Sequence, residues 1–461
     1  MLFHSTRGKD KDKTFEQVLM QGLADDGGLF IPDNWPKVDI NKLKELDTFL
    51  DVAKYIVPMF TQSSFDKSEV EEVLNNTWHD FSEKDLIKIF DIDESTSILE
   101  LFHGPTAAFK DFGLQLAAAF FNKTLQTQNK TAVVFGATSG DTGSAAIDAC
   151  KEFDVIKSFI LIPDGNMSEI QRKQMTTVDK SNVFPILVSG TFDDCQDIVK
   201  KGFSERSFLR DDQYLLAVNS INWVRIIGQI CYYFYASLIV NKLSHPLNFS
   251  VPTGNFGNVF ACYAASKMGM PLEKIIVAVN SNDILDRFFK NNDYSKKTVS
   301  ETISPSMDIS VASNFERLVY DFYLNRNSEA CSNLYNNFPE YGIKIDDEMW
   351  QKSEDLFMSY SINDDSTYES MKFYNNEYNY VMDPHTAVAA EAVSSLKDKL
   401  KNKTIILSTA HPAKFPNALK NAGIISDDIP DNLSKVISKE EVASKLSASE
   451  DSIFNYIKEN N

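Results

Sequence analysis

The stretch HGPTAAFKDFG, residues 103–113, places a single lysine, Lys110, in a run of apolar and small residues. Gly104 and Pro105 predict a turn before it, and the apolar spacing of FGLQLAAAFF (112–121) predicts a helix that begins near Lys110. A helix N-terminus and partial burial both disfavour an ammonium, so this amine should lose its proton more easily than usual. A neutral amine can attack a carbonyl and hold it as a Schiff base. The alternative is a lysine whose stem covers the first helical turn while its amine reaches solvent.

Strands and helices alternate on both sides of this stretch. From Ile98 onward, short apolar runs predict buried strands, and longer segments such as 222–240 predict the helices between them. The predicted strands are 131–137, 155–163, 183–190, 214–220, 248–253, 275–280 and 404–409. This alternation predicts an α/β fold with open, mostly parallel sheets covered by helices on both faces. There are enough units for two lobes between residues 96 and 423.

The rest of the chain has a different character. Residues 1–95 carry apolar residues at three- and four-residue steps, which predicts a mainly helical N-terminal domain. The region around 340–383 is acidic and rich in Asn and Tyr, and we expect a solvated helical insertion there. Residues 424–461 are polar with weak helical periodicity, which predicts a helical C-terminal tail on the surface.

Composition limits the possible functions. The sequence has 46 Lys and Arg against 65 Asp and Glu, a net charge of −19, which argues against binding to nucleic acids or anionic membranes. An anionic substrate would therefore need a local pocket of positive charge. The five cysteines form no CxxC pair and no cluster with histidine, so we expect reduced core thiols and no metal site.

Nothing in the sequence predicts export or membrane insertion. The N-terminal residues MLFHSTRGKDKDKTF contain no apolar segment typical of a secretion signal. The most apolar run, 226–240, is shorter than the roughly 20 residues that a spanning helix needs. We therefore expect a cytoplasmic protein.

Two glycine-rich turns follow predicted strands, at the sheet edge where open α/β folds bind ligands. In GATSGDTGSAAIDAC (136–150) a helix start offers backbone N–H groups and hydroxyls, which suit a carboxylate or a phosphate. In VPTGNFGNVFACYAA (251–265) consecutive N–H groups could surround one phosphate dianion, and glycine permits the close approach. The alternative for both is an ordinary capped helix start.

A third turn, STAHPAKFP (408–416), ends the last predicted strand. Thr409 would point a neutral hydroxyl into the crevice, whereas His411 is better interpreted as a structural residue. A lysine amine, a cradle for a dianion and a lone hydroxyl together suit pyridoxal phosphate, whose aldehyde, phosphate and pyridine nitrogen they would hold.

With these motifs in place, the chain resembles the threonine synthase family, in particular its longer microbial and fungal class. These are fold-type II pyridoxal-phosphate enzymes, similar in fold to the β subunit of tryptophan synthase. The matching blocks keep their order and spacing through nearly the whole chain: STRG, DGGLFIP, ELFHGPTAAFKDFG, ATSGDTGSAA, SGTFDDCQ, NSINWVRIIGQICYYF, VPTGNFGN, NSND, DPHTAVA and TAHPAKFP.

The resemblance implies roles for individual residues. Lys110 would be the Schiff-base lysine and general base, and Thr409 the partner of the pyridine nitrogen. Many relatives of the superfold have Asn where Asp141 stands, which leaves the partner of the cofactor's 3-hydroxyl open. The residues implied to hold the cofactor phosphate are Gly254, Asn255, Phe256, Gly257 and Asn258. Those implied to contact substrate are Thr138, Ser139, Gly140, Thr142, Asn222 and Arg225, with Lys173 as a weaker candidate.

The resemblance also implies the activity: conversion of O-phospho-L-homoserine and water to L-threonine and phosphate, the last step of threonine biosynthesis. A lyase that eliminates phosphate but releases a keto acid would share every cofactor residue, so the motifs leave that alternative open. A non-catalytic binding protein is disfavoured because Lys110 and all three turns are intact. We expect a monomer that acts on a small-molecule substrate and binds neither nucleic acid nor membrane.

Overall fold

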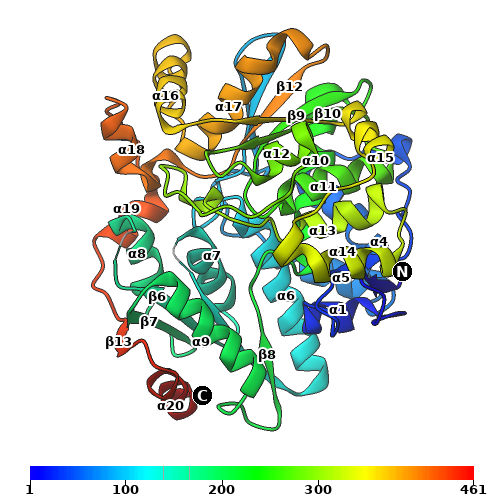
Figure 1. Cartoon of the computed structure of the whole chain (residues 1–461). Helices are drawn as coiled ribbons and strands as arrows, with labels where there is room; N and C mark the ends of the chain where they lie inside the picture. Colours follow the sequence, from blue (N-terminus) through cyan, green and yellow to red (C-terminus); the bar gives the residue numbers. More distant parts are fainter. Residues whose placement is uncertain (139, 166) are drawn as a thin grey trace.

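The computed structural model describes residues 1–138, 140–165 and 167–461 (Figure 1). In these residues the chain forms two open sheets and one two-stranded antiparallel sheet. The larger sheet has the order β11-β10-β9-β12-β4-β3 and is parallel except for the β3–β4 pair. Its strands are β3 (Lys88–Asp91), β4 (Thr96–Glu100), β9 (Leu247–Pro252), β10 (Leu272–Val279), β11 (Phe357–Ser361) and β12 (Thr404–Ser408).

The smaller sheet is parallel throughout, with the order β13-β7-β6-β5-β8. Its strands are β5 (Thr131–Ala137), β6 (Ile156–Pro163), β7 (Val183–Ser189), β8 (Gln213–Leu216) and β13 (Ser444–Ser447). The predicted parallel α/β architecture is therefore confirmed. The strand predicted at 214–220 ends earlier, at Leu216.

Both sheets pack on one central core. Val134 and Ile160 from the smaller sheet belong to the same buried cluster as Phe249 and Ile405 from the larger sheet. The opposite faces have cores of their own, around Ile406 in the larger sheet and around Phe135, Phe159 and Phe454 in the smaller one. Because both faces of each sheet are covered, the central strands β4, β6, β9 and β12 are buried almost continuously, whereas the edge strands β3 and β13 are partly exposed.

Two long helices cross within the central core: α6 (Lys110–Gln128) and α10 (Trp223–Asn241). A Cβ on Gly113 would lie 3.1 Å from the Arg225 backbone, and one on Gly228 would lie 2.9 Å from the Phe112 carbonyl. Glycine at both positions therefore lets the helices approach closely. Helix α10 is long and apolar enough to cross a membrane, but 89% of its most apolar window is buried inside the protein.

The N-terminal region is mainly helical, and it also contributes a small antiparallel pair, β1 (Phe3–Ser5) and β2 (Phe30–Pro32). Its buried residues, among them Phe15 and Phe49, join the central core rather than a separate one. Its helices are α1 (Phe15–Gln21), α2 (Ile40–Leu43), α3 (Phe49–Ile56), α4 (Pro58–Thr61) and α5 (Lys67–Asn75).

Two sequence predictions need correction. The region around 340–383 is not only a helical insertion: between α15 (Asp347–Gln351) and α16 (Asp364–Tyr378) it supplies β11, which pairs in parallel with β10. The segment 424–461 is likewise not only a helical tail. Between α19 (Asp431–Ile437) and α20 (Glu450–Asn460) it supplies β13, which pairs with β7. Both are short edge strands, which have weak sequence signals. The domain boundaries themselves stay a prediction.

Candidate active site

Lys110 is the first residue of α6 and is only 9% exposed. Its Nζ donates to Asp141 Oδ2 at 3.3 Å and to Ser306 Oγ at 3.2 Å. Burial lowers the pKa of the Lys110 amine; Asp141 opposes this effect, and the cations Lys414 and Arg225 add to it. The structure therefore gives Lys110 the buried, easily deprotonated amine that the sequence predicted, not an amine that reaches solvent.

Asp141 begins α7 (Asp141–Cys150) and lies between two lysines. Lys110 contacts one of its oxygens, and Lys414 Nζ contacts the other at 2.7 Å. Burial alone would raise the pKa of Asp141, but the two lysines outweigh it and hold the pKa well below its usual range. Lys414 is fully buried and was not predicted from the sequence. The sequence feature that could have indicated it is that Lys414, like Lys110, lies in an otherwise apolar turn, STAHPAKFP.

The GNFGN turn connects β9 to α11 (Gly257–Met268) and leaves its amides free. Within the described residues, none of the backbone N–H groups of 254–258 has a protein acceptor. Phe256 adopts a left-handed conformation with φ 64°, which turns the chain into the helix. A Cβ on Gly254 would lie 2.6 Å from the Ser306 carbonyl, so only glycine fits there.

Two asparagines fix this turn from behind. Asn258 Oδ1 accepts hydrogen bonds from the hydroxyls of Tyr232 and Tyr233, while its Nδ2 is buried without a partner in the described part of the chain. The Asn255 carbonyl accepts from both the backbone N–H and the side-chain amide of Asn314, each at 3.0 Å. Free amides at a helix N-terminus, held rigidly near a lysine amine, fit the phosphate and aldehyde of pyridoxal phosphate.

Thr409 directly follows β12 and is 6% exposed. Its carbonyl accepts from the Phe109 N–H at 2.9 Å, and the adjacent Ala410 forms a β-bridge with Ala108. The strand end that carries Thr409 is thus joined to the turn that carries Lys110. The role of its hydroxyl stays a prediction.

His411 has a structural position, in line with the sequence interpretation. Its Nδ1 accepts from the Ala413 N–H at 3.2 Å, and burial lowers the pKa of the imidazole to about 4. With Nδ1 occupied and its pKa near 4, the ring is a weak base at neutral pH.

In the turn at 138–142, some polar groups hydrogen-bond within the turn itself and others face the site. The Thr138 hydroxyl accepts from the N–H groups of Gly140 and Gly143, at 3.2 and 3.0 Å, and so caps its own helix. In the described residues the N–H groups of Asp141 and Thr142 have no acceptor, and they remain available for an anion. Ser139 lies outside the described residues.

Among the residues implied for substrate binding elsewhere in the chain, Arg225 is near enough to Lys110 for its charge to lower the pKa of that amine. Its guanidinium is buried, donates from Nη1 to the Val218 carbonyl at 3.2 Å, and has no partner for Nε among the described residues. Asn222 caps α10 and donates to the Leu19 carbonyl, so its amide is already used. Lys173, on α8 (Glu169–Thr176), donates to the Ile437 carbonyl and pairs with Glu169.

Two buried residues that the sequence did not predict, His385 and Asp383, hold the exposed residue Ser306. The Ser306 N–H donates to His385 Nε2 at 3.1 Å, which requires the neutral tautomer with its proton on Nδ1. That Nδ1–H then donates to Asp383 Oδ1 at 2.7 Å. Both residues lie at the start of α17 (Pro384–Leu396), in the DPHTAVA block. The network places the Ser306 hydroxyl against Lys110 and its carbonyl against Gly254.

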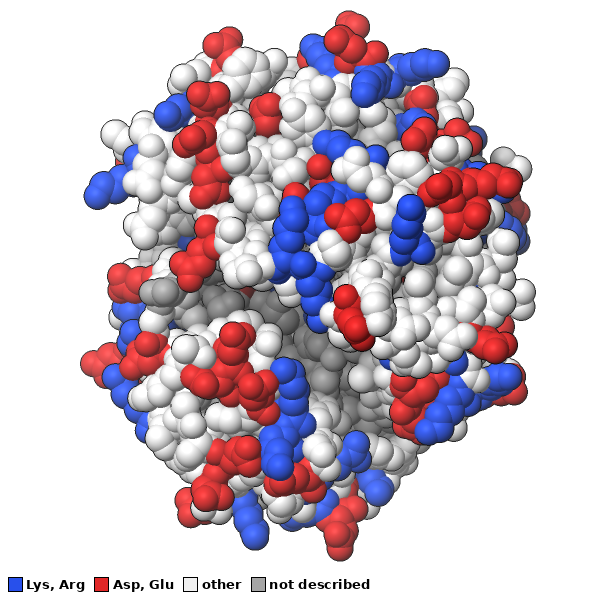
Figure 2. Space-filling model, in the orientation of Figure 1, with Lys and Arg blue, Asp and Glu red and all other residues white. Residues whose placement is uncertain are grey.

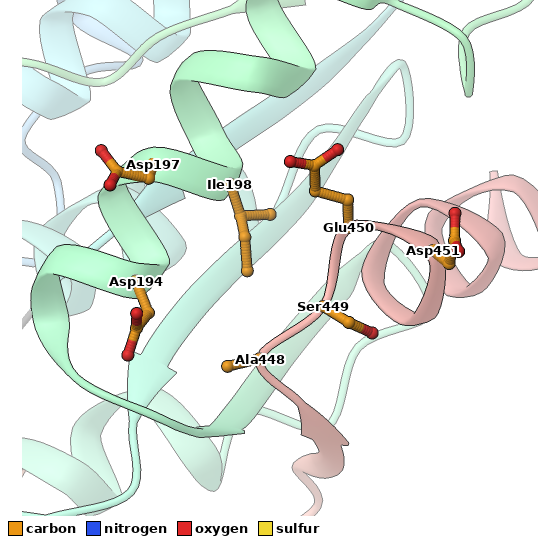
Figure 3. A pocket seen from close by; sticks show the side chains of 7 residues that line it. All are labelled: Asp194, Asp197, Ile198, Ala448, Ser449, Glu450 and Asp451. Carbon is orange, nitrogen blue, oxygen red and sulfur yellow. The ribbon is translucent and has the colours of Figure 1, made fainter.

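Figure 2 shows acidic and basic side chains interspersed, with a hollow across the middle of the face in view. A separate shallow hollow lies between α9 (Phe192–Glu205) and the start of α20 (Figure 3). It is lined by Asp194, Asp197, Ile198, Ala448, Ser449, Glu450 and Asp451. Four carboxylates make it unsuitable for an anion, and none of these residues belongs to the group around Lys110.

The fold and the group around Lys110 define a class of protein. Two open α/β sheets that bring a lysine, free amides of a glycine-rich turn and a hydroxyl to their strand ends form a fold-type II pyridoxal-phosphate enzyme. The profile of the family described as pyridoxal-phosphate dependent enzyme matches residues 98–333. Profiles described as threonine synthase N terminus and threonine synthase, C-terminal match residues 2–78 and 386–457. The chain belongs to the threonine synthase family.

Individual relatives agree along nearly the whole chain. The chain is 40% identical to threonine synthase from Pseudomonas aeruginosa over 445 residues, which cover 96% of this chain and 94% of the relative. It is 39% identical to threonine synthase from Saccharomyces cerevisiae, with 94% and 93% covered. The crystal structure of threonine synthase from Brucella melitensis with bound pyridoxal phosphate matches with a TM-score of 0.95 at 35% identity, covering 99% of each chain. Pyridoxal phosphate is therefore the cofactor.

Proposed function

We propose that this enzyme converts O-phospho-L-homoserine and water to L-threonine and inorganic phosphate, with Lys110 as the covalent anchor of the cofactor and the main proton carrier. The observation that supports this most strongly is the buried Lys110 amine, which lies 3.3 Å from Asp141 beside a helix N-terminus with free amides. Pyridoxal phosphate, joined through its aldehyde to the substrate's amino nitrogen, would withdraw electrons from the adjacent Cα.

The remaining residues bind and orient. The free N–H groups of residues 254–258 hold the cofactor phosphate, and Thr409 faces the pyridine nitrogen. The amides of Asp141 and Thr142 face the substrate carboxylate, and Arg225 supplies a fixed positive charge for the substrate phosphate. Lys110, released from the cofactor when substrate binds, moves protons at the substrate's Cα and Cβ. Ser306 and Asp141 keep its amine oriented toward the reacting atoms.

Substitution of Lys110 by Ala tests this assignment. We expect Lys110→Ala to lose the visible absorption of the covalently held cofactor and all turnover while it retains the wild-type circular dichroism. A variant that still holds the cofactor covalently would show that another lysine is the anchor.

The reaction outcome needs a product assay, because a lyase that releases a keto acid would use the same cofactor residues. Incubation with O-phospho-L-homoserine, with threonine, 2-oxobutyrate and phosphate measured in the same sample, distinguishes the two. Threonine equal to the phosphate released supports the proposal; 2-oxobutyrate as the main product contradicts it.

We further propose that the enzyme acts as a monomer in the cytoplasm. The five cysteines are buried and form no disulfide, as suits a reducing compartment. Light scattering coupled to size exclusion, and cell fractionation, test the two statements separately.

A further inference from the structure

Two lysines share one buried carboxylate at the site. Lys110 Nζ lies 3.3 Å from Asp141 Oδ2, and Lys414 Nζ lies 2.7 Å from Asp141 Oδ1. Gln171 Nε2 also donates to Oδ1, at 3.0 Å. Lys414 is fully buried, and both Asp141 and Gln171 are nearly so. A fully buried ammonium is costly unless it is paired, so the position of Lys414 needs a reason.

Lys414 joins three segments that meet at Lys110. It lies in the short 3₁₀ turn that follows Thr409 and His411. Besides Asp141, its Nζ donates to the Thr106 carbonyl at 2.8 Å, in the turn that precedes α6. The same carbonyl accepts from Gln174 Nε2, and the Thr106 hydroxyl and N–H both donate to Asp111. The turn is thus anchored several times, so Lys414 is not needed merely to hold it.

We propose that Lys414 is a positioning residue that neutralises Asp141, so that Lys110 can lose its proton without leaving an unpaired buried carboxylate. With Lys110 neutral, Asp141 and Lys414 sum to zero charge. With Lys110 protonated, the same three groups carry one net positive charge in a buried place. This inference rests on the proposed role of Lys110 and adds to it the residue that sets the charge of that amine.

The other groups that face Lys110 act in the same direction or are neutral. Arg225, on α10, adds a second positive charge that lowers the pKa of Lys110, and Ser306 contributes only a hydroxyl. Asp141 is the anion that opposes them. If Lys414 were absent, Asp141 would pair with Lys110 alone and stabilise the ammonium.

Competitive labelling with acetic anhydride measures the proton affinity of Lys110 directly. The full-length protein is stripped of cofactor, acetylated at a series of pH values, and the modification of Lys110 is quantified by mass spectrometry. We expect the pH at which acetylation of Lys110 is half-maximal, its midpoint, to rise by about one pH unit or more in Lys414→Met. In that variant the Asp141 carboxylate would pair with Lys110 alone and stabilise its ammonium. The midpoint should fall in Asp141→Asn, which leaves Lys414 as an unopposed cation nearby.

The double variant Lys414→Met/Asp141→Asn separates this role from a purely structural one. If Lys414 acts through Asp141, the double variant returns the midpoint toward the wild-type value. If Lys414 instead acts by holding the Thr106 carbonyl, Gln174→Leu, which removes the other donor to that carbonyl without changing the charge, shifts the midpoint in the same direction as Lys414→Met. Lys403→Met, which removes a lysine paired with Asp91 at the other end of β12, is the matched control and should leave the midpoint unchanged.

Unchanged midpoints in both single variants would overturn the inference. If Lys414→Met does not fold, Asp141→Asn still decides, since an unchanged midpoint in that variant contradicts the charge balance by itself. The pH dependence of the bound cofactor's visible absorption gives a second readout on the loaded enzyme. Neither measurement uses substrate, so a failure here is distinguishable from a failure of the proposed reaction.

Discussion

Arg225 is a buried cation that lacks a carboxylate partner in the described residues. Burial lowers the pKa of the guanidinium to about 10, so it stays charged at neutral pH. A buried charge without a counter-ion is costly in free energy, and a bound anionic substrate would supply that counter-ion. Because the protein has a net charge of −19, an anionic substrate needs such a local positive charge to bind. Its planar donors also suit a phosphate dianion.

We therefore expect Arg225→Leu to keep the cofactor and its spectrum but to lose turnover of O-phospho-L-homoserine by at least about 100-fold, or roughly 2.7 kcal/mol. Inhibition by inorganic phosphate should weaken in parallel, and Arg225→Lys should recover part of both. Because the variant removes an unpaired buried charge, the melting temperature should not fall. A lower melting temperature with unchanged phosphate inhibition would mean that the arginine is structural.

Asp111, next to Lys110, should make the folding stability fall as pH rises, whereas most carboxylates in folded proteins make it rise. Burial and the nearby Asp148 raise the pKa of Asp111 to about 7, although Thr106 donates two hydrogen bonds to it. The folded state then binds a proton more tightly than the unfolded state, so this group costs stability as pH rises from about 4 to 7. The full effect is roughly 4 kcal/mol.

Urea denaturation at intervals between pH 4.5 and 8 checks this prediction. We expect Asp111→Asn to flatten the fall in the free energy of unfolding across that window relative to wild type. Asp148, whose pKa burial also raises, keeps part of the slope in the variant. An unchanged slope would mean that Asp111 is already ionised in the folded protein throughout this pH range.

Among the elements, Arg317 on α13 (Phe315–Leu318) connects the GNFGN turn to the N-terminal strand pair β1 and β2 through hydrogen bonds. This fully buried arginine donates to the Phe30 carbonyl in β2 at 2.9 Å, to the Ile221 carbonyl at 2.6 Å, and to Asn314 Oδ1. Asn314 in turn holds the Asn255 carbonyl. The N-terminal region therefore supports the cofactor turn from a distance.

Arg317→Met should lower the free energy of unfolding by roughly 2–4 kcal/mol, because it leaves buried carbonyls without donors. It should also weaken cofactor binding. Arg326→Met is the matched control: Arg326 donates to the Pro32 and Asp33 carbonyls and pairs with Asp321, without touching Asn314. It should destabilise the fold and leave cofactor affinity, measured by equilibrium dialysis, unchanged. Equal cofactor affinity in the two variants would argue against the connection through Asn314.

At the same scale, the sequence predicted those elements whose signals are local. The strand β5 is apolar on both faces and β6 contains the apolar run FILIP, while β5 and β9 are each followed by a glycine-rich turn, so the type and position of these strands could be inferred. The strands β11 and β13 could not be inferred, because FMSYS and SKLS are short, half-polar runs that become strands only by pairing with β10 and β7.

The site was predictable to the same extent. Lys110 and the GNFGN turn carry distinctive local patterns, whereas Lys414, Ser306 and His385 gain their positions only from tertiary contacts across more than 75 residues of chain.

For the whole molecule, the C-terminal segment completes both a sheet and a core. Strand β13 covers the edge of β7, and Ile453, Phe454 and Ile457 of α20 pack into the cluster that contains Phe135. Deletion of residues 442–461 should cost on the order of 5 kcal/mol from lost apolar burial alone and should expose a sheet edge that can pair with other chains.

Melting curves and light scattering on heating test this. Ile457→Ala, which keeps β13, should lower stability by about 2–4 kcal/mol without promoting aggregation below the transition. If the deletion and the point variant aggregate equally, the exposed edge is not the cause.

The central core shared by the two sheets has a consequence for how the protein comes apart. Because residues from β5, β6, β9, β12 and the first five helices meet in one buried cluster, neither sheet keeps a complete hydrophobic interior when the other melts. We therefore expect that the lobes do not fold independently and that melting of either one destabilises the other. Any opening that admits substrate must be small enough to leave that common interior sealed. Adjustment is accordingly confined to the outer strands and the turns at the sheet edges, where fewer buried contacts resist it.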